Sequence, residues 1–384
     1  MHHKTSLLGL FVLMGLGCIS KPFTKSTIGR LGEWRGNYAA TRPVIPESVI
    51  LSNRCHLLKL NNGYAIHDYV YGTVYIVDSE SKVKRIVKGG SFSDFAIYKS
   101  IKNDSTGYHD RKTIHKNALR QIKKYEPFIE GVTARNNKLY YQLTYLIPES
   151  MKIEHEDVIG LMPYAVCAVE DEKQSYKFYS LDILSKPYLT STAAILPASK
   201  PNEWIIPVTR DVAKKAGNEV YYTAGQFELS NGRFKLIRNI LPMPGIYKSK
   251  KVYYNFSIPV VSYPWVALPL DNKVVNLTTR REFKLPFNND KLLFKPDEND
   301  SDGMYIPYTI IGLSTTANRI RLLVRQSSEY KRAESLSLYV YSKDLKLESV
   351  RKFDINQKKL ISDFSTNSTG EFIALNDKYE IISI

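Results

Sequence analysis

A cysteine near the start of the chain has the surroundings that most clearly specify a chemical reaction. Cys18 follows a basic residue at Lys4, the apolar run Leu7–Met14 and the small residues Gly15 and Gly17. A positive start, a short apolar core and small residues before a cleavage point are features of a secretory signal. The pattern predicts cleavage between Gly17 and Cys18 and lipidation of the Cys18 sulfur.

Lipidation of Cys18 predicts an anchor for the mature protein. Each buried methylene of an acyl chain contributes about 0.8 kcal/mol, so several chains hold a protein firmly at a membrane. The apolar run is about half the roughly 20 residues that a membrane-spanning helix needs. We therefore expect a palmitate-bearing outer-membrane lipoprotein, periplasmic or exposed at the cell surface. Gly15 and Leu16 depart from the preferred residues, so an ordinary signal peptide and an uncleaved anchor stay open as alternatives.

Two histidine-containing segments carry residue types that can bind a metal ion. Glu154-His155-Glu156-Asp157 places three carboxylates around one imidazole, but this spacing matches no standard zinc-ligand helix, and an exposed acidic loop is expected. His109, Asp110 and His115 fall in a segment with helical periodicity, where positions i and i+6 lie on different faces. Neither segment predicts a metal centre.

An oxygen-rich loop offers a third possible metal site. Asp297–Gly303 is the most acidic cluster of the chain, and such loops can bind Ca²⁺. With Gly303 at the sixth position of an EF-hand loop, Thr309 stands where a bidentate Glu is required. A solvated connection is the expectation, so we predict no metal and no other cofactor.

His67-Asp68-Tyr69 is the most suggestive cluster for proton transfer, because a histidine beside an aspartate can act as a tuned base. Adjacent residues of a strand point to opposite faces, so His67 and Asp68 are not expected to form a dyad. A structural histidine is favoured. The sequence contains no Gly-x-Ser-x-Gly elbow, no His-Glu-x-x-His helix and no phosphate-binding Gly-rich loop, so no catalytic residue is predicted.

Composition indicates a basic, globular chain. The net charge is +16 and 43% of the residues are hydrophobic. Such an excess of positive charge favours anionic partners such as acidic polysaccharide or lipid head groups, although an inert basic surface is an alternative. The charges are scattered and the protein is expected to be exported, so nucleic acid is not predicted as a partner.

Two further cysteines, Cys55 and Cys167, lie in apolar strand-like runs. In an oxidising compartment they could form a disulfide. Buried free thiols are the alternative that the apolar surroundings support.

The sequence divides into a signal peptide at 1–17, a tether at 18–45 and one domain at 46–384. Short β-branched and aromatic runs at 55–60, 64–69, 73–78 and 82–87 are separated by turn residues such as Asn62-Gly63. This pattern is typical of an antiparallel meander. Four strands in this length are the size of one propeller blade.

A polar turn followed by an apolar strand recurs six times, at Asn62, Asn137, Asn202, Asn272, Asn318 and Thr369. The mean spacing of about 61 residues exceeds the roughly 40–50 residues of typical blade repeats, so several blades must carry insertions. The chain ends with three expected strands at 359–363, 371–375 and 379–384. The run Val49–Ser52 is predicted to complete this last blade and close the ring.

One segment, residues 109–125, departs from the strand pattern. It places Ile114, Ala118, Leu119, Ile122 and Tyr125 at helical spacing. We expect a short basic amphipathic helix inserted near the second blade, which either packs on a propeller face or forms part of a binding surface.

The Asn62-Gly63 block, Tyr75–Asp78 followed by Lys82–Ile86, and the terminal Gly370–Asp377 resemble blades of the six-bladed TolB-like β-propeller lipoproteins of Bacteroidetes. The resemblance covers residues 46–384. It implies an all-β propeller of six four-stranded antiparallel blades, exported and lipid-anchored. It carries over no functional residues.

The function expected from these observations is non-enzymatic ligand binding or scaffolding at the cell envelope. A propeller offers rigid loop-built faces, and aromatic and basic side chains suit a glycan or an envelope protein partner. We expect a monomer. A hydrolase or lyase acting on polysaccharide or lactone is the main alternative, and a sensor module in a larger envelope complex is another.

Overall fold

The computed structural model describes the blades of the chain and most of their turns. The described residues are 34–35, 39–43, 45, 49–92, 127–136, 138–153, 156–171, 173–181, 189–190, 195–210, 212–215, 218–231, 233–242, 260–268, 272–286, 308–329, 332–353 and 360–384. The predicted helix at 109–125 lies outside these ranges, as does the signal segment. None of the helical structure in the described ranges is both long and apolar enough to cross a membrane.

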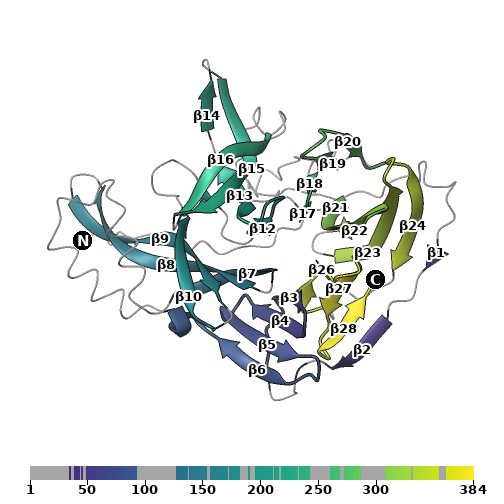
Figure 1. Cartoon of the computed structure of the whole chain (residues 1–384), viewed down its shortest axis with the longest axis horizontal. Helices are drawn as coiled ribbons and strands as arrows, with labels where there is room; N and C mark the ends of the chain where they lie inside the picture. Colours follow the sequence, from purple (N-terminus) through teal and green to yellow (C-terminus); the bar gives the residue numbers. More distant parts are fainter. Residues whose placement is uncertain are drawn as a thin grey trace, which may run out of the picture.

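Six antiparallel blades of four strands are arranged around a centre, as the sequence predicts (Figure 1). Blade one is followed by the 3₁₀ turn η1 (Gly89–Phe92), and short strands supplement blade three. The strands of the first three blades are β3 (Cys55–Leu60), β4 (Gly63–Asp68), β5 (Thr73–Asp78) and β6 (Val83–Val87); β7 (Phe128–Arg135), β8 (Lys138–Ile153), β9 (Glu156–Glu170) and β10 (Tyr176–Leu181); and β11 (Leu189–Thr190), β12 (Leu196–Pro197), β13 (Glu203–Arg210), β14 (Val212–Lys215), β15 (Asn218–Ser230) and β16 (Arg233–Pro242).

In the second half of the ring, as in the first, the consecutive strands of each blade follow one another from the centre outward. The edge strands of blades two and three, β10 and β16, also pair with each other in parallel, so these two blades form one continuous sheet. The remaining strands are β17 (Val260–Ser262), β18 (Trp265–Leu268), β19 (Lys273–Asn276) and β20 (Glu282–Lys284) in blade four; β21 (Tyr308–Thr315), β22 (Arg319–Glu329), β23 (Arg332–Ser342) and β24 (Leu347–Phe353) in blade five; and β26 (Ser365–Thr366), β27 (Phe372–Leu375) and β28 (Glu380–Ser383) in blade six. Two short strands run parallel to strands of other segments: β25 (Ser362–Asp363) lies beside β3 of blade one, and β1 (Trp34–Arg35) lies beside β24.

The ring is closed by β2 (Ala39–Pro43), which pairs antiparallel with β28 (Figure 1). The prediction that Val49–Ser52 supplies this strand is wrong. Those residues instead lead into blade one, where Ser52 bonds to Asp68 and the Leu51 amide donates to the Tyr379 hydroxyl at 3.3 Å. Because β2 falls within 18–45, part of the segment predicted as a tether belongs to the propeller.

Each pair of neighbouring blades encloses its own hydrophobic cluster. Between blades one and two, for example, Val74 and Ala65 pack with Ile129 and Tyr141. Five further clusters of the same kind occupy the other blade interfaces, including the closure between blades six and one. Burial of apolar surface at about 25 cal/mol per Å² therefore stabilises the ring at every interface, closure included.

Arg135 joins blades two and three through polar contacts as well. Its guanidinium donates to the carbonyl oxygens of Glu203 (2.8 Å), Ala198 (3.0 Å) and Lys200 (2.7 Å), and it lies 5.0 Å from the centre of the Trp204 ring. A planar cation with several fixed donors suits such a site better than a lysine does.

The predicted turn-strand repeat matches the blades. Five of its six instances fall at the turn between the first and second strands of a blade, at 62, 137, 202, 318 and 369. The instance at Asn272 lies instead between the second and third strands of blade four. At the first of these turns Gly63 has φ +133°, and a Cβ there would lie 1.9 Å from the Val77 carbonyl oxygen, so this turn requires glycine.

The two faces of the propeller differ. Turns between the first and second strands, and between the third and fourth, lie on one face, which we call the turn face; it includes 61–62, 79–82, 316–318 and 343–346. Antiparallel order places the links between consecutive blades on the opposite face, together with the turns between second and third strands. We call this the connection face. Strands β3 and β7 begin on the connection face, and the candidate site described below lies beside their first residues.

Candidate functional site

His67 and Asp68, adjacent at the end of β4, point to different partners, as strand geometry predicts. His67 Nε2 lies 2.8 Å from the carbonyl oxygen of Ile129 in blade two. Asp68 faces the incoming chain: its Oδ2 accepts from the Ser52 amide at 2.7 Å, and its Oδ1 accepts from the Ser52 hydroxyl at 2.7 Å and from the Val70 amide at 3.0 Å. They form no catalytic dyad, and Asp68 is structural.

The hydrogen bond of His67 fixes its tautomer. A carbonyl oxygen only accepts, so Nε2 carries the proton and Nδ1 is an unprotonated acceptor. Nδ1 is buried and has no hydrogen-bond donor among the described residues. The pKa of His67 is lowered to about 4, chiefly by burial and to a smaller extent by the nearby His56, while the Ile129 bond and Asp68 raise it. His67 is therefore neutral at pH 7.

A row of polar residues crosses three neighbouring strands at the inner end of blade one. His67 on β4 is paired with His56 on β3, and His56 is paired with Asp363 on β25, which runs parallel to β3. Directly paired residues of a sheet share a face. Two imidazoles and a carboxylate from opposite ends of the chain thus lie side by side.

Tyr69 and Arg325 complete this group, which we call the inner cluster: His56, His67, Tyr69, Arg325 and Asp363. The Tyr69 ring lies 4.6 Å from that of His67 and 6.4 Å from that of His56, measured between centroids. Arg325, on β22, feels the charge of Asp363, which raises its pKa against the stronger lowering by burial. Burial likewise lowers the pKa of His56, against the opposing charge of Asp363.

The inner cluster is open to water although protein surrounds it. Arg325 and Asp363 are exposed, and His56 and Tyr69 are half-buried. The same groups are nonetheless desolvated enough for burial to be the main influence on the pKa of His56, Tyr69 and Arg325. This combination favours strong polar contacts with a molecule that enters from solvent.

An apolar ledge adjoins the cluster on the connection face. Val70 and Tyr71, in the turn that follows Tyr69, are 51% and 62% exposed, and Phe128 at the start of β7 is 38% exposed. The Phe128 ring covers Gly72, where a Cβ would lie 2.8 Å from the ring. We use the name ledge for Val70, Tyr71 and Phe128.

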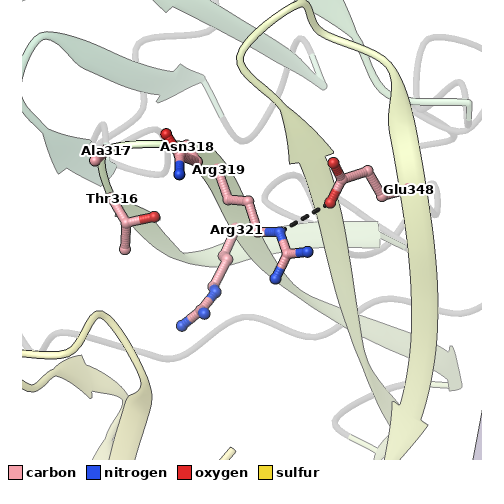
Figure 2. Close-up of a pocket in the computed structure, with 6 residues that line it drawn as sticks. All are labelled: Thr316, Ala317, Asn318, Arg319, Arg321 and Glu348. Atoms are coloured by element: carbon pink, nitrogen blue, oxygen red, sulfur yellow. Dashed lines mark hydrogen bonds and ion pairs between the residues drawn. The ribbon is translucent and has the colours of Figure 1, made fainter.

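A recess of about 570 Å³ lies elsewhere, at the turn between β21 and β22 on the turn face (Figure 2). Its charged groups already have protein partners: Arg319 Nε donates to Glu348 at 2.9 Å, and Arg321 donates to the Gly370 carbonyl oxygen at 3.1 Å. It is lined by Thr316, Ala317, Asn318, Arg319, Arg321 and Glu348. These pairings join β22 to β24 and to the turn between β26 and β27, and we place the candidate site at the inner cluster.

Two cysteines and two acidic residues that the sequence singled out lie in strands β3 and β9. Cys55 and Cys167 are buried free thiols in different interblade clusters, so they form no disulfide. Burial raises the pKa of Cys55 to about 12 and also raises that of Cys167. Glu156 and Asp157 belong to β9, opposite Ile153 and Lys152.

The remaining predicted residues lie outside the described ranges: Cys18, His109, Asp110, His115, Glu154, His155 and the loop 297–303. Within those ranges no group of His, Cys, Asp and Glu side chains has the arrangement of a metal site.

Sequence reasoning singled out His67 and Tyr69 but missed His56, Arg325 and Asp363. The sequence predicts Asp363 in a terminal strand and His56 in the first strand, but it does not indicate that these two residues are neighbours. The signal that could have found them is the ring itself, because closure brings the last blade beside the first.

Comparison with known proteins shows a likeness to solved structures. No family model matches the chain, and no curated protein matches it. Among solved structures, a protein of Bacteroides fragilis NCTC 9343 described as a candidate exported protein is similar with a TM-score of 0.49 and 11% sequence identity. The match covers 89% of this chain and 84% of that one. A likeness at this level says nothing about the chemistry of the inner cluster.

Proposed function

We propose that this chain is an exported, lipid-anchored protein of the cell envelope that binds a ligand, without chemical turnover, on the connection face of its propeller. The observation that carries the proposal is the inner cluster beside the ledge. Opposite charges, imidazoles and aromatic side chains meet there, partly open to water. Such a mixture of a few polar groups with apolar surface is typical of ligand sites.

The electrostatics of the cluster support binding rather than catalysis. A general base works best with a pKa near the operating pH. The pKa of His67 is about 4, and its Nε2 is already bonded to a carbonyl oxygen. His56 also has a lowered pKa. Both imidazoles are thus suited to neutral hydrogen bonding at pH 7.

Export and anchoring are supported by the Cys18 signal and by the resemblance to TolB-like propeller lipoproteins. We expect Cys18→Ala to abolish incorporation of radiolabelled palmitate and to release the protein from membranes into the soluble envelope fraction. Ser20→Ala, two residues further on, is the matched control and should label normally. Label that survives in Cys18→Ala would contradict lipidation at this residue.

Binding without turnover is tested on the purified mature protein. Calorimetric titration with a panel of neutral and acidic oligosaccharides and lactones should give saturable heat for at least one compound, and Asp363→Asn should weaken that binding at least tenfold. Chromatography should show the compound unchanged after prolonged incubation.

Two results would contradict this proposal. Product formation that Asp363→Asn abolishes would establish the hydrolase or lyase alternative. Absence of binding across the panel, or binding that Asp363→Asn leaves intact, would remove the inner cluster as the ligand site.

A further inference from the structure

The charges of the inner cluster balance, although the chain as a whole is strongly basic. The cluster holds one cation, Arg325, and one anion, Asp363, while His56 and His67 are neutral at pH 7. A second carboxyl group, Glu130, follows Phe128 by two residues on β7, and burial raises its pKa. The five residues of the inner cluster therefore contribute nothing to the net charge of +16.

The ledge adds flat aromatic surface next to these polar groups. Tyr71 and Phe128 come from different blades, and the ring of Phe128 lies against Gly72, the residue after Tyr71. Exposed aromatic rings that are held in place by their neighbours offer contact area at a low entropic cost. The apolar faces of pyranose rings are suited to pack on such rings.

We infer that the ligand of this face is an uncharged oligosaccharide, with a sugar ring on the Tyr71 and Phe128 rings and hydroxyl groups bonded to Asp363, Arg325 and His56. This inference rests on the proposed function and narrows it to one ligand class. A carboxylate accepts from hydroxyls, a guanidinium donates to them, and a neutral imidazole does either. The three groups together match a polyol, whose hydroxyls both donate and accept.

An acidic polysaccharide, the partner that net charge alone suggests, fits this site less well. Its carboxylates would approach the exposed carboxyl group of Asp363. Like charges placed together in an interface cost several kcal/mol. Arg325, the cation of the five-residue cluster, already has Asp363 as a neighbour.

The test is calorimetric titration of the full mature protein with two sets of probes. The neutral set is maltohexaose, cellohexaose, xylohexaose and mannohexaose, and the acidic set is hexagalacturonate and a heparin hexasaccharide. We expect one or more of the neutral sugars to bind, with at least tenfold weaker affinity in Asp363→Ala and about tenfold weaker affinity in Tyr71→Ala. A tenfold change corresponds to about 1.4 kcal/mol, within the range of an aromatic contact.

Matched controls keep the test specific. Asp344→Ala and Ile237→Ala remove an exposed carboxylate and an exposed apolar side chain away from the site, and both should bind like the wild type. Asp363 and Tyr71 are themselves exposed, so their variants are expected to fold, and an unchanged melting temperature verifies this.

Failure of the inference differs from failure of the proposed function. If only the acidic probes bind, and Asp363→Ala leaves or strengthens that binding, the neutral-sugar inference is overturned. If a lactone or another compound from the wider panel binds in an Asp363-dependent way while all four neutral sugars do not, the proposed binding function stands and the ligand class is wrong. Neutral sugars that bind every variant equally place the sugar site elsewhere.

Discussion

Asp68→Ala is expected to lower the free energy of unfolding by about 3–5 kcal/mol, because it removes the shared acceptor of four hydrogen bonds. The Asp68 carboxylate is fully buried. It accepts from the amides of Ser52, Val70 and Tyr71 and from the Ser52 hydroxyl. Its removal leaves these part-buried donors without their acceptor, and a hydrogen bond to a charged group contributes about 1.5–3 kcal/mol. Urea denaturation of the wild type and the variant measures the difference.

Asp68→Asn separates charge from geometry. An asparagine offers one acceptor oxygen and one donor group, so its NH₂ would oppose either the Ser52 amide or the Val70 and Tyr71 amides. We expect it to cost nearly as much as alanine. Ser52→Ala, which removes only the 2.7 Å hydroxyl bond, should cost about 1 kcal/mol, and the exposed Asp377→Ala about 0.5 kcal/mol or less. A loss below about 1 kcal/mol for Asp68→Ala would show that Asp68 does not organise this junction.

The number of blades was predictable from the sequence because each blade repeats a local pattern. The turn at Asn62-Gly63 and its counterparts sit where a tight turn must join the first two strands, and local turn chemistry is written in local residues. The identity of the strand that closes the ring, in contrast, depends on residues far apart in the sequence. Whether Ala39–Pro43 or Val49–Ser52 pairs with β28 depends on the path of the chain around Asp68 and Tyr379, which no spacing rule gives.

A stronger repeat went unnoticed in the sequence. Five turns of five residues each begin with Asp, Asn or Ser. The first residue of each turn forms hydrogen bonds with the fourth and fifth residues through its backbone or side chain, and the fourth residue has a positive φ. Four of these side chains accept from the fifth amide at 2.8–2.9 Å. The turns are 78–82, 171–175, 342–346, 367–371 and 376–380. Only one has glycine at the fourth position, which is why a search for Gly-containing turns misses them.

The inner cluster was only partly predictable because, like the strand that closes the ring, it depends on pairing between distant segments. His67 and Tyr69 lie in a motif of adjacent residues, whereas Asp363 reaches His56 through the parallel pairing of β25 with β3. Pairing between distant segments follows from the closed ring, and a single sequence contains no signal for its register. The neighbouring charges of Arg325 and Asp363, on which the inference of a neutral ligand rests, therefore come together only in the folded protein.

The stability of the protein is expected to fall on acidification because of His67. Its pKa is about 4 in the folded protein, where burial is the largest cause, and about 6.5 in the unfolded chain. Between these values the unfolded chain binds the proton and the folded protein does not. The free energy of unfolding contributed by this group is thus constant above about pH 7 and decreases as pH falls to 4, by about 3 kcal/mol in total.

His67→Gln isolates this contribution, since the glutamine amide can still donate to the Ile129 carbonyl oxygen but does not titrate. Urea denaturation of both proteins at pH 4, 5, 6 and 7 should show a difference in unfolding free energy that shifts by about 3 kcal/mol in favour of the variant toward pH 4. Carboxylates titrate in both proteins and cancel in the difference. Titration of the His67 imidazole by NMR supplies an independent check that requires no variant. A His67 pKa near 6.5, or parallel stability curves for the two proteins, would mean that burial does not hold this imidazole neutral.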